Sequence, residues 1–407
     1  MKLNRNFKVL FYFIGVMVIS TLACGQLEVG IDTSNIPSST DTPETTNATN
    51  PENTPENQPP DNPDAQAWME TATQAPYSVP AKFAGLVFRK DNGLWVVDEG
   101  GVPLLAAENI YDGSLSPDLS HLVFPNQVED LFHLDLNTGE LIKLTDTPNI
   151  LERGALWWPA RSGVLIYNLM DQEELGPWSG FLGAYDLNTN ELKVLDSVSR
   201  SWHGFTLSPD GSAILYDNAG NPVLYRWGEG ISTLDMTSFG INYQNYSAPA
   251  WSPDGKTVAF HAIRNPESGG PSEAAIILVN LESGLAREIH PYQSAGQRGP
   301  AEIAFSPDGR WLAVVTHGEM EVLDTGPMAL WVIAADQSEE HYMGYGTGPV
   351  WSPTGNLLLF TKWPAPGTGG GSFQEDAHIM MADSAAWTTQ EVDPLLGSNL
   401  LNWYPLP

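Results

Sequence analysis

Carboxylates dominate the side chains that could do chemistry in this 407-residue chain, with 49 Asp and Glu against 18 Lys and Arg. Two carboxylates roughly 5–9.5 Å apart would suit glycoside hydrolysis, and several converging ones would suit Ca²⁺. The eight histidines show no i, i+2 or i, i+4 spacing. No Gly-x-Ser-x-Gly, His-Glu-x-x-His or Walker-type motif occurs. No catalytic set can be chosen from these residues, and we expect a protein that is not an enzyme.

The charge balance and the cysteine count exclude several classes of protein. A formal charge of −31 leaves no surplus of cations to neutralise phosphates, so we expect no nucleic-acid partner. The only cysteine, Cys24, excludes an intramolecular disulfide and a Cys-based zinc site. We therefore expect no cofactor, with Ca²⁺ bound by loop carboxylates as the alternative.

The first 23 residues have the pattern of a signal peptide. Lys2, Arg5 and Lys8 precede a 15-residue apolar run that is too short for a comfortable membrane span of about 20 residues. The run ends in Thr-Leu-Ala-Cys-Gly, which resembles a bacterial lipobox. The resemblance implies that residues 1–23 are removed and that Cys24 carries the lipid. A plain secretory signal is the alternative. We expect a bacterial, extracytoplasmic protein of the cell envelope, lipid-anchored to the membrane.

Residues 24–82 are predicted to be a disordered tether that begins with the lipidated cysteine. They are rich in Thr, Pro, Asn and Glu, without a helical or strand period. Their apolar content cannot offset the entropy of ordering. Trp68 and Met69 are interpreted as a chance pair within this linker. The tether would give a folded head, at residues 83–407, distance from its anchor.

The head repeats one phrase, an apolar residue followed by Ser-Pro-Asp-Gly and an apolar strand. The repeating prolines are Pro117, Pro159, Pro209, Pro253, Pro307 and Pro353, 42 to 54 residues apart. A period in the forties with four short strands predicts an all-β fold, a β-propeller of four-stranded blades. The phrase resembles the WD40-like repeats of TolB-type β-propellers. The resemblance implies the fold and is weak for function, because propellers host unrelated chemistries.

The two ends of the head predict how the ring closes. Residues 85–88, 94–97 and 102–105 have the pattern of strands two, three and four of a blade that lacks its first strand. Residues 401–405 have the pattern of a first strand that lacks the rest. Pairing of these N- and C-terminal strands would close the propeller and remove an open sheet edge. This gives seven four-stranded blades, with six as the alternative if the unit at Trp158-Pro159 is irregular.

The candidate binding residues lie on one face of the predicted ring, where the long loops between strands two and three gather. Function commonly resides in such variable loops on a rigid scaffold. The other face is expected to carry tight turns only. Candidates at the channel mouth and on the long-loop face are Tyr111, Asp112, Arg153, His203, Glu302, Asn399, Trp178 and Trp363. The carboxylates that could hold Ca²⁺ are Asp171, Glu173, Glu174, Glu375 and Asp376.

From these patterns we expect a monomeric propeller that binds or scaffolds an extracytoplasmic protein, peptide or glycan without catalysis. One alternative is a propeller hydrolase or lyase that acts on glycans and needs two facing carboxylates in a deep pocket. A second alternative is an accessory subunit of an envelope membrane complex, which would carry a large apolar patch on the propeller side.

Overall fold

The computed structural model describes residues 67–110, 113–125, 130–146, 150–158, 161, 163–171, 179–199, 205–265, 272–294, 302–316, 328–364 and 378–406. The expected signal peptide, Cys24 and most of the expected tether lie outside the described residues. In the described part, no helix is long and apolar enough to cross a membrane.

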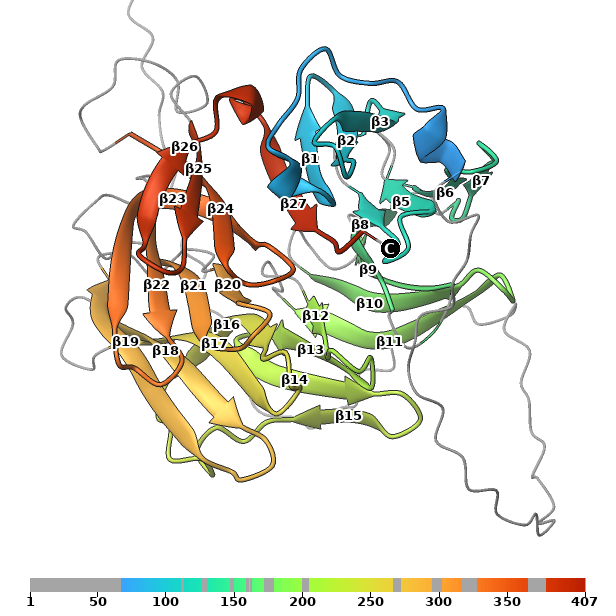
Figure 1. Cartoon of the computed structure of the whole chain (residues 1–407). Helices are drawn as coiled ribbons and strands as arrows, with labels where there is room; N and C mark the ends of the chain where they lie inside the picture. The colour runs from blue at the N-terminus through green and yellow to red at the C-terminus, as the bar shows by residue number, and fades with distance from the viewer. Residues whose placement is uncertain are drawn as a thin grey trace, which may run out of the picture. The chain divides into compact units, whose positions relative to one another are not determined.

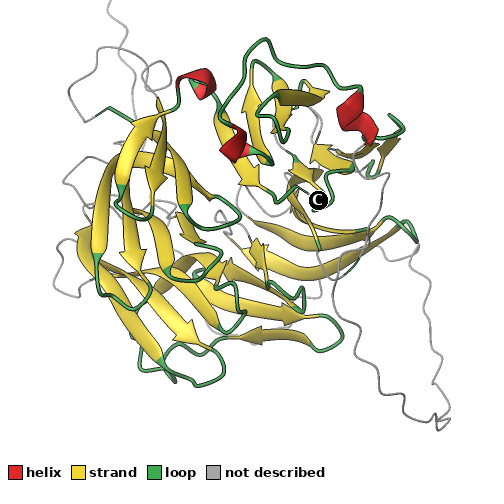
Figure 2. Ribbon diagram, in the orientation of Figure 1, coloured by secondary structure: helices red, strands yellow, loops and turns green. Residues whose placement is uncertain are grey.

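The described chain consists mainly of antiparallel strands arranged around an axis (Figures 1 and 2). The strands are β1 (Leu86–Lys90), β2 (Gly93–Val97), β3 (Pro103–Glu108), β4 (Ser114–Leu115), β5 (His121–Pro125), β6 (Leu131–Asp135), β7 (Leu141–Lys143), β8 (Ile150–Trp157), β9 (Val164–Asp171), β10 (Ser179–Asp186), β11 (Glu191–Ser199), β12 (Phe205–Leu207), β13 (Ala213–Asn218), β14 (Asn221–Arg226), β15 (Gly230–Thr233), β16 (Asn245–Trp251), β17 (Thr257–Arg264), β18 (Ser272–Asn280), β19 (Ala286–Ser294), β20 (Glu302–Phe305), β21 (Trp311–Thr316), β22 (Ala329–Ala334), β23 (Glu340–Trp351), β24 (Leu357–Lys362), β25 (His378–Asp383), β26 (Thr388–Glu391) and β27 (Asn399–Trp403). Three short 3-10 helices accompany them: η1 (Ala67–Glu70), η2 (Ala81–Phe83) and η3 (Asp393–Leu395).

The strand pairing is that of a β-propeller, as the sequence predicts. Consecutive strands form four-stranded blades: β4–β7, β8–β11, β12–β15 and β16–β19. The long strand β23 pairs with β22 through its first half and with β24 through its second, so it joins β20–β26 into one seven-stranded sheet. The described strands thus pair into five four-stranded sheets and one seven-stranded sheet. The count of seven blades stays a prediction.

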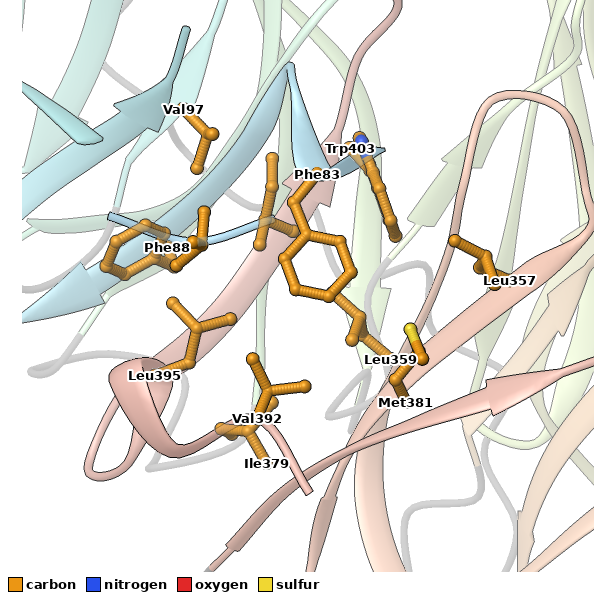
Figure 3. Close-up of a cluster of buried hydrophobic side chains, with 12 residues drawn as sticks. Phe83, Phe88, Val97, Leu357, Leu359, Ile379, Met381, Val392, Leu395 and Trp403 are labelled. Carbon is orange, nitrogen blue, oxygen red and sulfur yellow. The ribbon is translucent and has the colours of Figure 1, made fainter. Parts of the chain in front are cut away.

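The closing blade is confirmed. β27 pairs with β1 in a sheet of order β27-β1-β2-β3, so the two ends of the propeller share one blade. The indole N–H of Trp403 donates to the Ala84 carbonyl at 2.8 Å, and the ring meets Phe83 edge-on at 5.6 Å between centroids. Figure 3 shows these rings within an apolar cluster that also includes Leu359 of β24 and Leu395 of η3. The closure therefore combines main-chain pairing with a buried core.

The repeated phrase makes the same turn at five places in the described chain. In each, the serine hydroxyl accepts the backbone N–H of the residue five positions later, at 2.9–3.0 Å. These serines are Ser116, Ser208, Ser252, Ser306 and Ser352. All five serines are buried, so each bond pairs a main-chain donor with a hydroxyl that is shielded from water.

Residues before the boundary expected at residue 83 already pack against the propeller. The side chain of Trp68 is 6 % exposed, packs near Leu104 and Leu122, and donates its indole N–H to the Leu119 carbonyl at 2.8 Å. Gln74 forms a β-bridge with Leu104. Trp68 is therefore not a chance residue of a linker, because burial of one large aromatic ring outweighs the polar composition around it.

Candidate functional site

The innermost strands of the blades share a bulge. In β8, β16 and β23 the register with the next strand shifts, and the residues at the bulge, Gly154, Ala248 and Gly348, have φ of 63°, 49° and 61°. Each lies five positions before a repeating proline. A bulge leaves main-chain groups unpaired and bends the strand, so it alters the inner strands at equivalent places.

Glu302 lies at the same offset from its proline, at the start of β20. Its carboxylate accepts the N–H of Gly348, in the bulge of the next inner strand, at 2.8 Å. Burial raises the pKa of Glu302, and the hydrogen bond from Gly348 partly opposes the rise. This predicted site residue therefore lies at the junction of two inner strands.

Trp363, another predicted site residue, contacts the same bulge. Its indole N–H donates to the hydroxyl of Thr347 at 3.0 Å, and its backbone N–H donates to the Tyr345 carbonyl. Glu302 and Trp363 therefore contact consecutive residues of β23. The indole is half-buried, so part of it is available to a ligand.

A cavity of about 330 Å³ opens between four of the inner strands. Leu401 and Asn402 of β27, Leu115 of β4 and Phe205 of β12 are among its walls, with residues 154–156 of β8. The Tyr404 hydroxyl donates to the Leu115 carbonyl at 3.1 Å and so fixes its ring at one side. Burial raises the pKa of Tyr404. The cavity is mainly apolar, with main chain exposed at the β8 bulge.

The other predicted site residues are not brought together by the described structure. Asn399 is exposed at the start of β27, opposite Arg89 of β1. Arg153 belongs to β8 and Asp171 ends β9, but their side chains lie outside what the structure describes. Outside the described residues altogether lie Tyr111, Asp112, Trp178, His203, Glu173, Glu174, Glu375 and Asp376.

The described residues contain no group of three or more His, Cys, Asp or Glu side chains that could hold a metal ion. His121 and His133 form a pair, because β5 and β6 bring their ring nitrogens to 3.2 Å although they are twelve residues apart in sequence, and Asp135 lies 3.9 Å from His121. Burial and the neighbouring His121 lower the pKa of His133. The two histidines meet because their strands pair, and their spacing in the sequence does not indicate the contact.

Sequence reasoning missed a basic and aromatic cluster on the face where only tight turns were expected. Trp158 and Arg161 of the turn before β9 meet Trp227 at the end of β14. The signal was present in the sequence: the repeat that precedes β9 replaces Ser-Pro-Asp-Gly by Trp-Pro-Ala-Arg-Ser-Gly. The unit at Trp158-Pro159 was counted among the repeats, with an irregular unit as the alternative, but the contacts of the replacing side chains depend on the neighbouring blade.

No protein-family model and no curated protein matches this chain. Among solved structures, it is similar to an oligogalacturonate lyase in complex with manganese, at 17% identity over 73% of this chain and 84% of that one, with a TM-score of 0.52. An oligogalacturonate lyase from Vibrio parahaemolyticus gives 15% identity, the same coverages and a TM-score of 0.51. TolB from Acinetobacter baumannii gives 17% identity over 64% of each chain and a TM-score of 0.43. The two lyase matches, at such low identity, show the propeller fold alone.

Proposed function

We propose that this chain is a lipid-anchored protein of the bacterial cell envelope whose propeller binds a protein, peptide or glycan without catalysis. The anchor and the location rest on the sequence of residues 1–24. The binding role rests on the axial cavity, which is the observation that carries the proposal.

The cavity suits a partner that inserts an apolar side chain. About 330 Å³ is at the lower end of the size range of ligand pockets. Its walls include Leu115, Phe205 and Leu401, so an aliphatic or aromatic group would lose contact with water on entering. The bulge at Gly154 adds main-chain groups that can hydrogen-bond the partner's backbone. Inner strands from separate blades thus form one receptor surface.

A glycan-acting enzyme is the second candidate, and one observation favours it. Glu302 is a partly buried carboxyl group at the junction of two inner strands, and burial shifts its pKa upward, the direction that suits a general acid or base. An acidic glycan such as the oligogalacturonate named for the similar lyases would be the first substrate to test. Formation of unsaturated oligosaccharide that is lost in Glu302→Gln would favour this candidate over binding alone.

Site-specific cross-linking tests the binding role. A photo-reactive amino acid replaces Leu401, a 38 % exposed residue at the cavity, or Leu285, a 72 % exposed residue of the turn before β19. Irradiation of cells should give a discrete adduct from position 401 only, although position 285 is more accessible. An adduct that Phe205→Ala abolishes would assign it to the cavity. Equal labelling from both positions, or none from 401, would reject the proposed site.

A further inference from the structure

An open pocket of about 820 Å³ lies between the β8–β11 and β12–β15 blades, which are neighbours in Figure 1. It is formed by tight turns, and it shares no lining residue with the axial cavity. The lining residues are Arg161, Val164, Asp186, Asp210, Gly211, Ser212, Arg226, Trp227 and Glu229.

Two cations lie on the indole of Trp227. The guanidinium carbon of Arg161 is 4.1 Å and the ammonium nitrogen of Lys193 is 4.5 Å from the ring centroid. Trp158 meets the same ring edge-on at 5.4 Å between centroids. Cation–π attraction holds each charge within about 6 Å of the ring without neutralising it. The two charges are therefore placed in advance of any ligand.

These two cations differ from those that form ion pairs elsewhere in the described part of the chain. Lys143, Lys256 and Arg264 each form an ion pair with a carboxylate. Among the described residues, Arg161 and Lys193 form no ion pair, although the chain offers 49 carboxylates. Arg161 and Trp227 line the pocket, and Lys193 lies at its edge through its contact with the Trp227 ring.

The repeat is broken at this pocket. Four of the equivalent turns carry an aspartate after their proline: Asp118, Asp210, Asp254 and Asp308. The turn before β9 has Ala160 there and Arg161 next, so a negative charge is replaced by a positive one. Hydrogen bonds from the Arg161 N–H to the Trp158 carbonyl and from the Val164 N–H to the Arg161 carbonyl, both 3.0 Å, fix the main chain under the arginine.

The carboxylates of the pocket are mostly used by their own turns. Asp210 accepts the Ser208 hydroxyl at 2.7 Å and the Ser212 N–H at 2.9 Å. Asp186 accepts the Asn188 N–H at 2.8 Å. Glu229 is exposed at the turn between β14 and β15. One carboxylate oxygen of Asp186 and one of Asp210 are therefore already occupied by hydrogen bonds within their own turns.

We propose that this pocket binds a ligand whose oxyanion group, a carboxylate or a phosphate, is held by Arg161 and Lys193. The planar guanidinium fork matches either group. The volume is that of a small-molecule site, so a sugar-sized body can lie beside Trp227 and Val164. This binding site is independent of the axial cavity and of the proposed function.

The test is calorimetric titration of the full chain with three sugars that differ at one position: glucuronate, glucose 6-phosphate and glucose. We expect saturable binding of at least one anionic sugar that weakens as NaCl rises from 20 to 300 mM, and binding of glucose about tenfold weaker or more. The two anionic sugars distinguish a carboxylate ligand from a phosphate ligand. Absence of binding by both anionic sugars, or equal binding of glucose, would overturn the proposal.

Matched variants assign the binding to this pocket. Arg161→Gln and Lys193→Gln should each weaken the anionic sugar by about tenfold, as expected for loss of a charge-assisted hydrogen bond. Lys256→Gln removes another exposed lysine, which is paired with Glu282 in another blade, and it should leave the affinity unchanged. Unfolding curves check that the variants fold. Wild-type affinity in a folded Arg161→Gln protein would place the binding elsewhere and reject the site.

Discussion

Two turns that occupy the same place in neighbouring blades are built in opposite ways. Before β13, Ser208 and Asp210 bind donors that all lie within residues 208–213. Before β9, Trp158 donates its indole N–H to the Gly211 carbonyl of the next blade, and Arg161 lies over Trp227 of that blade. The first turn satisfies its own polar groups, whereas the second depends on its neighbour.

The difference separates a turn that specifies the fold from one that can carry recognition. A turn that satisfies its own buried groups can repeat around the ring with little effect on the surface. In the turn before β9, by contrast, the side chains contact the neighbouring blade and line the pocket between the two blades. Substitutions in the two kinds of turn should therefore differ in both the size and the kind of their effects.

The largest effect is expected at Trp158. Its side chain is 2 % exposed, packs on Trp227 and bridges two blades, so Trp158→Ala leaves a cavity and an unpaired Gly211 carbonyl. We expect the free energy of unfolding to fall by about 3–5 kcal/mol, measured by urea titration. Trp387→Ala removes a half-buried tryptophan of another turn and is the control, with a smaller loss. A loss below about 1 kcal/mol for Trp158→Ala would make the bridge between the blades unimportant.

Two carboxyl groups of the β12–β15 blade should respond to pH with opposite sign. Hydrogen bonds, first from Ser208, hold the pKa of Asp210 below its usual value, so its contribution to stability is present above the unfolded pKa and is lost as pH falls through the folded one. Burial raises the pKa of Asp217 from 3.8 to about 7. Its contribution is complete below the unfolded pKa and is lost as pH rises towards 7, at most about 4 kcal/mol.

Asp217→Asn is the variant that tests this sign. Asp217 is 2 % exposed, and its Oδ2 has no hydrogen-bond partner in the described part of the chain. The variant should be more stable than the wild type at pH 8 and should lose that advantage by pH 4, measured as unfolding free energy across the range. Asp210→Asn should be less stable than the wild type at pH 8, and this difference in unfolding free energy should disappear towards pH 2. Parallel pH curves for Asp217→Asn and the wild type would contradict the buried, protonated carboxyl group.

A moderate effect is expected in the self-contained turns. Ser306 is fully buried, accepts the Trp311 N–H at 3.0 Å and donates to Asp308 at 2.6 Å. Ser306→Ala leaves that buried N–H unsatisfied and should lower the unfolding free energy by about 1–3 kcal/mol. Ser338→Ala, in an exposed turn, should change it by less than about 0.5 kcal/mol. Equal effects of the two variants would show that water replaces the serine in the repeated turn.

The fold could be predicted from the sequence because its determinants are local and repeated. Ser-Pro-Asp-Gly recurs at a fixed place relative to a strand, and the unmatched strands at the two ends leave one way to close the ring. The closing pair β27 and β1 is confirmed. The packing of Trp68 could not be predicted, because the polar composition around it indicates a tether and its partner Leu119 is 51 residues away.

The site was predicted less well, for a physical reason. Glu302 and Trp363 were named, and both contact the β23 bulge. Their common contact depends on the approach of inner strands from different blades, which no spacing in the sequence encodes. At the pocket, Arg161 and Lys193 both contact the ring of Trp227, which lies 34 or more residues further along the chain than either cation. Only the break in the repeat marks it, and such a break becomes informative once the neighbouring blade is known.

The smallest effect on stability is expected at Arg161. An exposed or half-buried cation–π contact contributes about 0.5–1 kcal/mol, so Arg161→Gln should lower the unfolding free energy by no more than that, in contrast to Trp158→Ala in the same turn. The measurement is urea unfolding at low and at high NaCl. Because no carboxylate partner of Arg161 is found among the described residues, the difference from the wild type should change little with salt. Arg264→Gln, which breaks the pair with Glu273, is the control whose effect should shrink as salt rises. If Arg161→Gln instead costs several kcal/mol, the arginine is a structural part of the bridge between the blades, and the division between folding turns and a recognition turn fails at this residue.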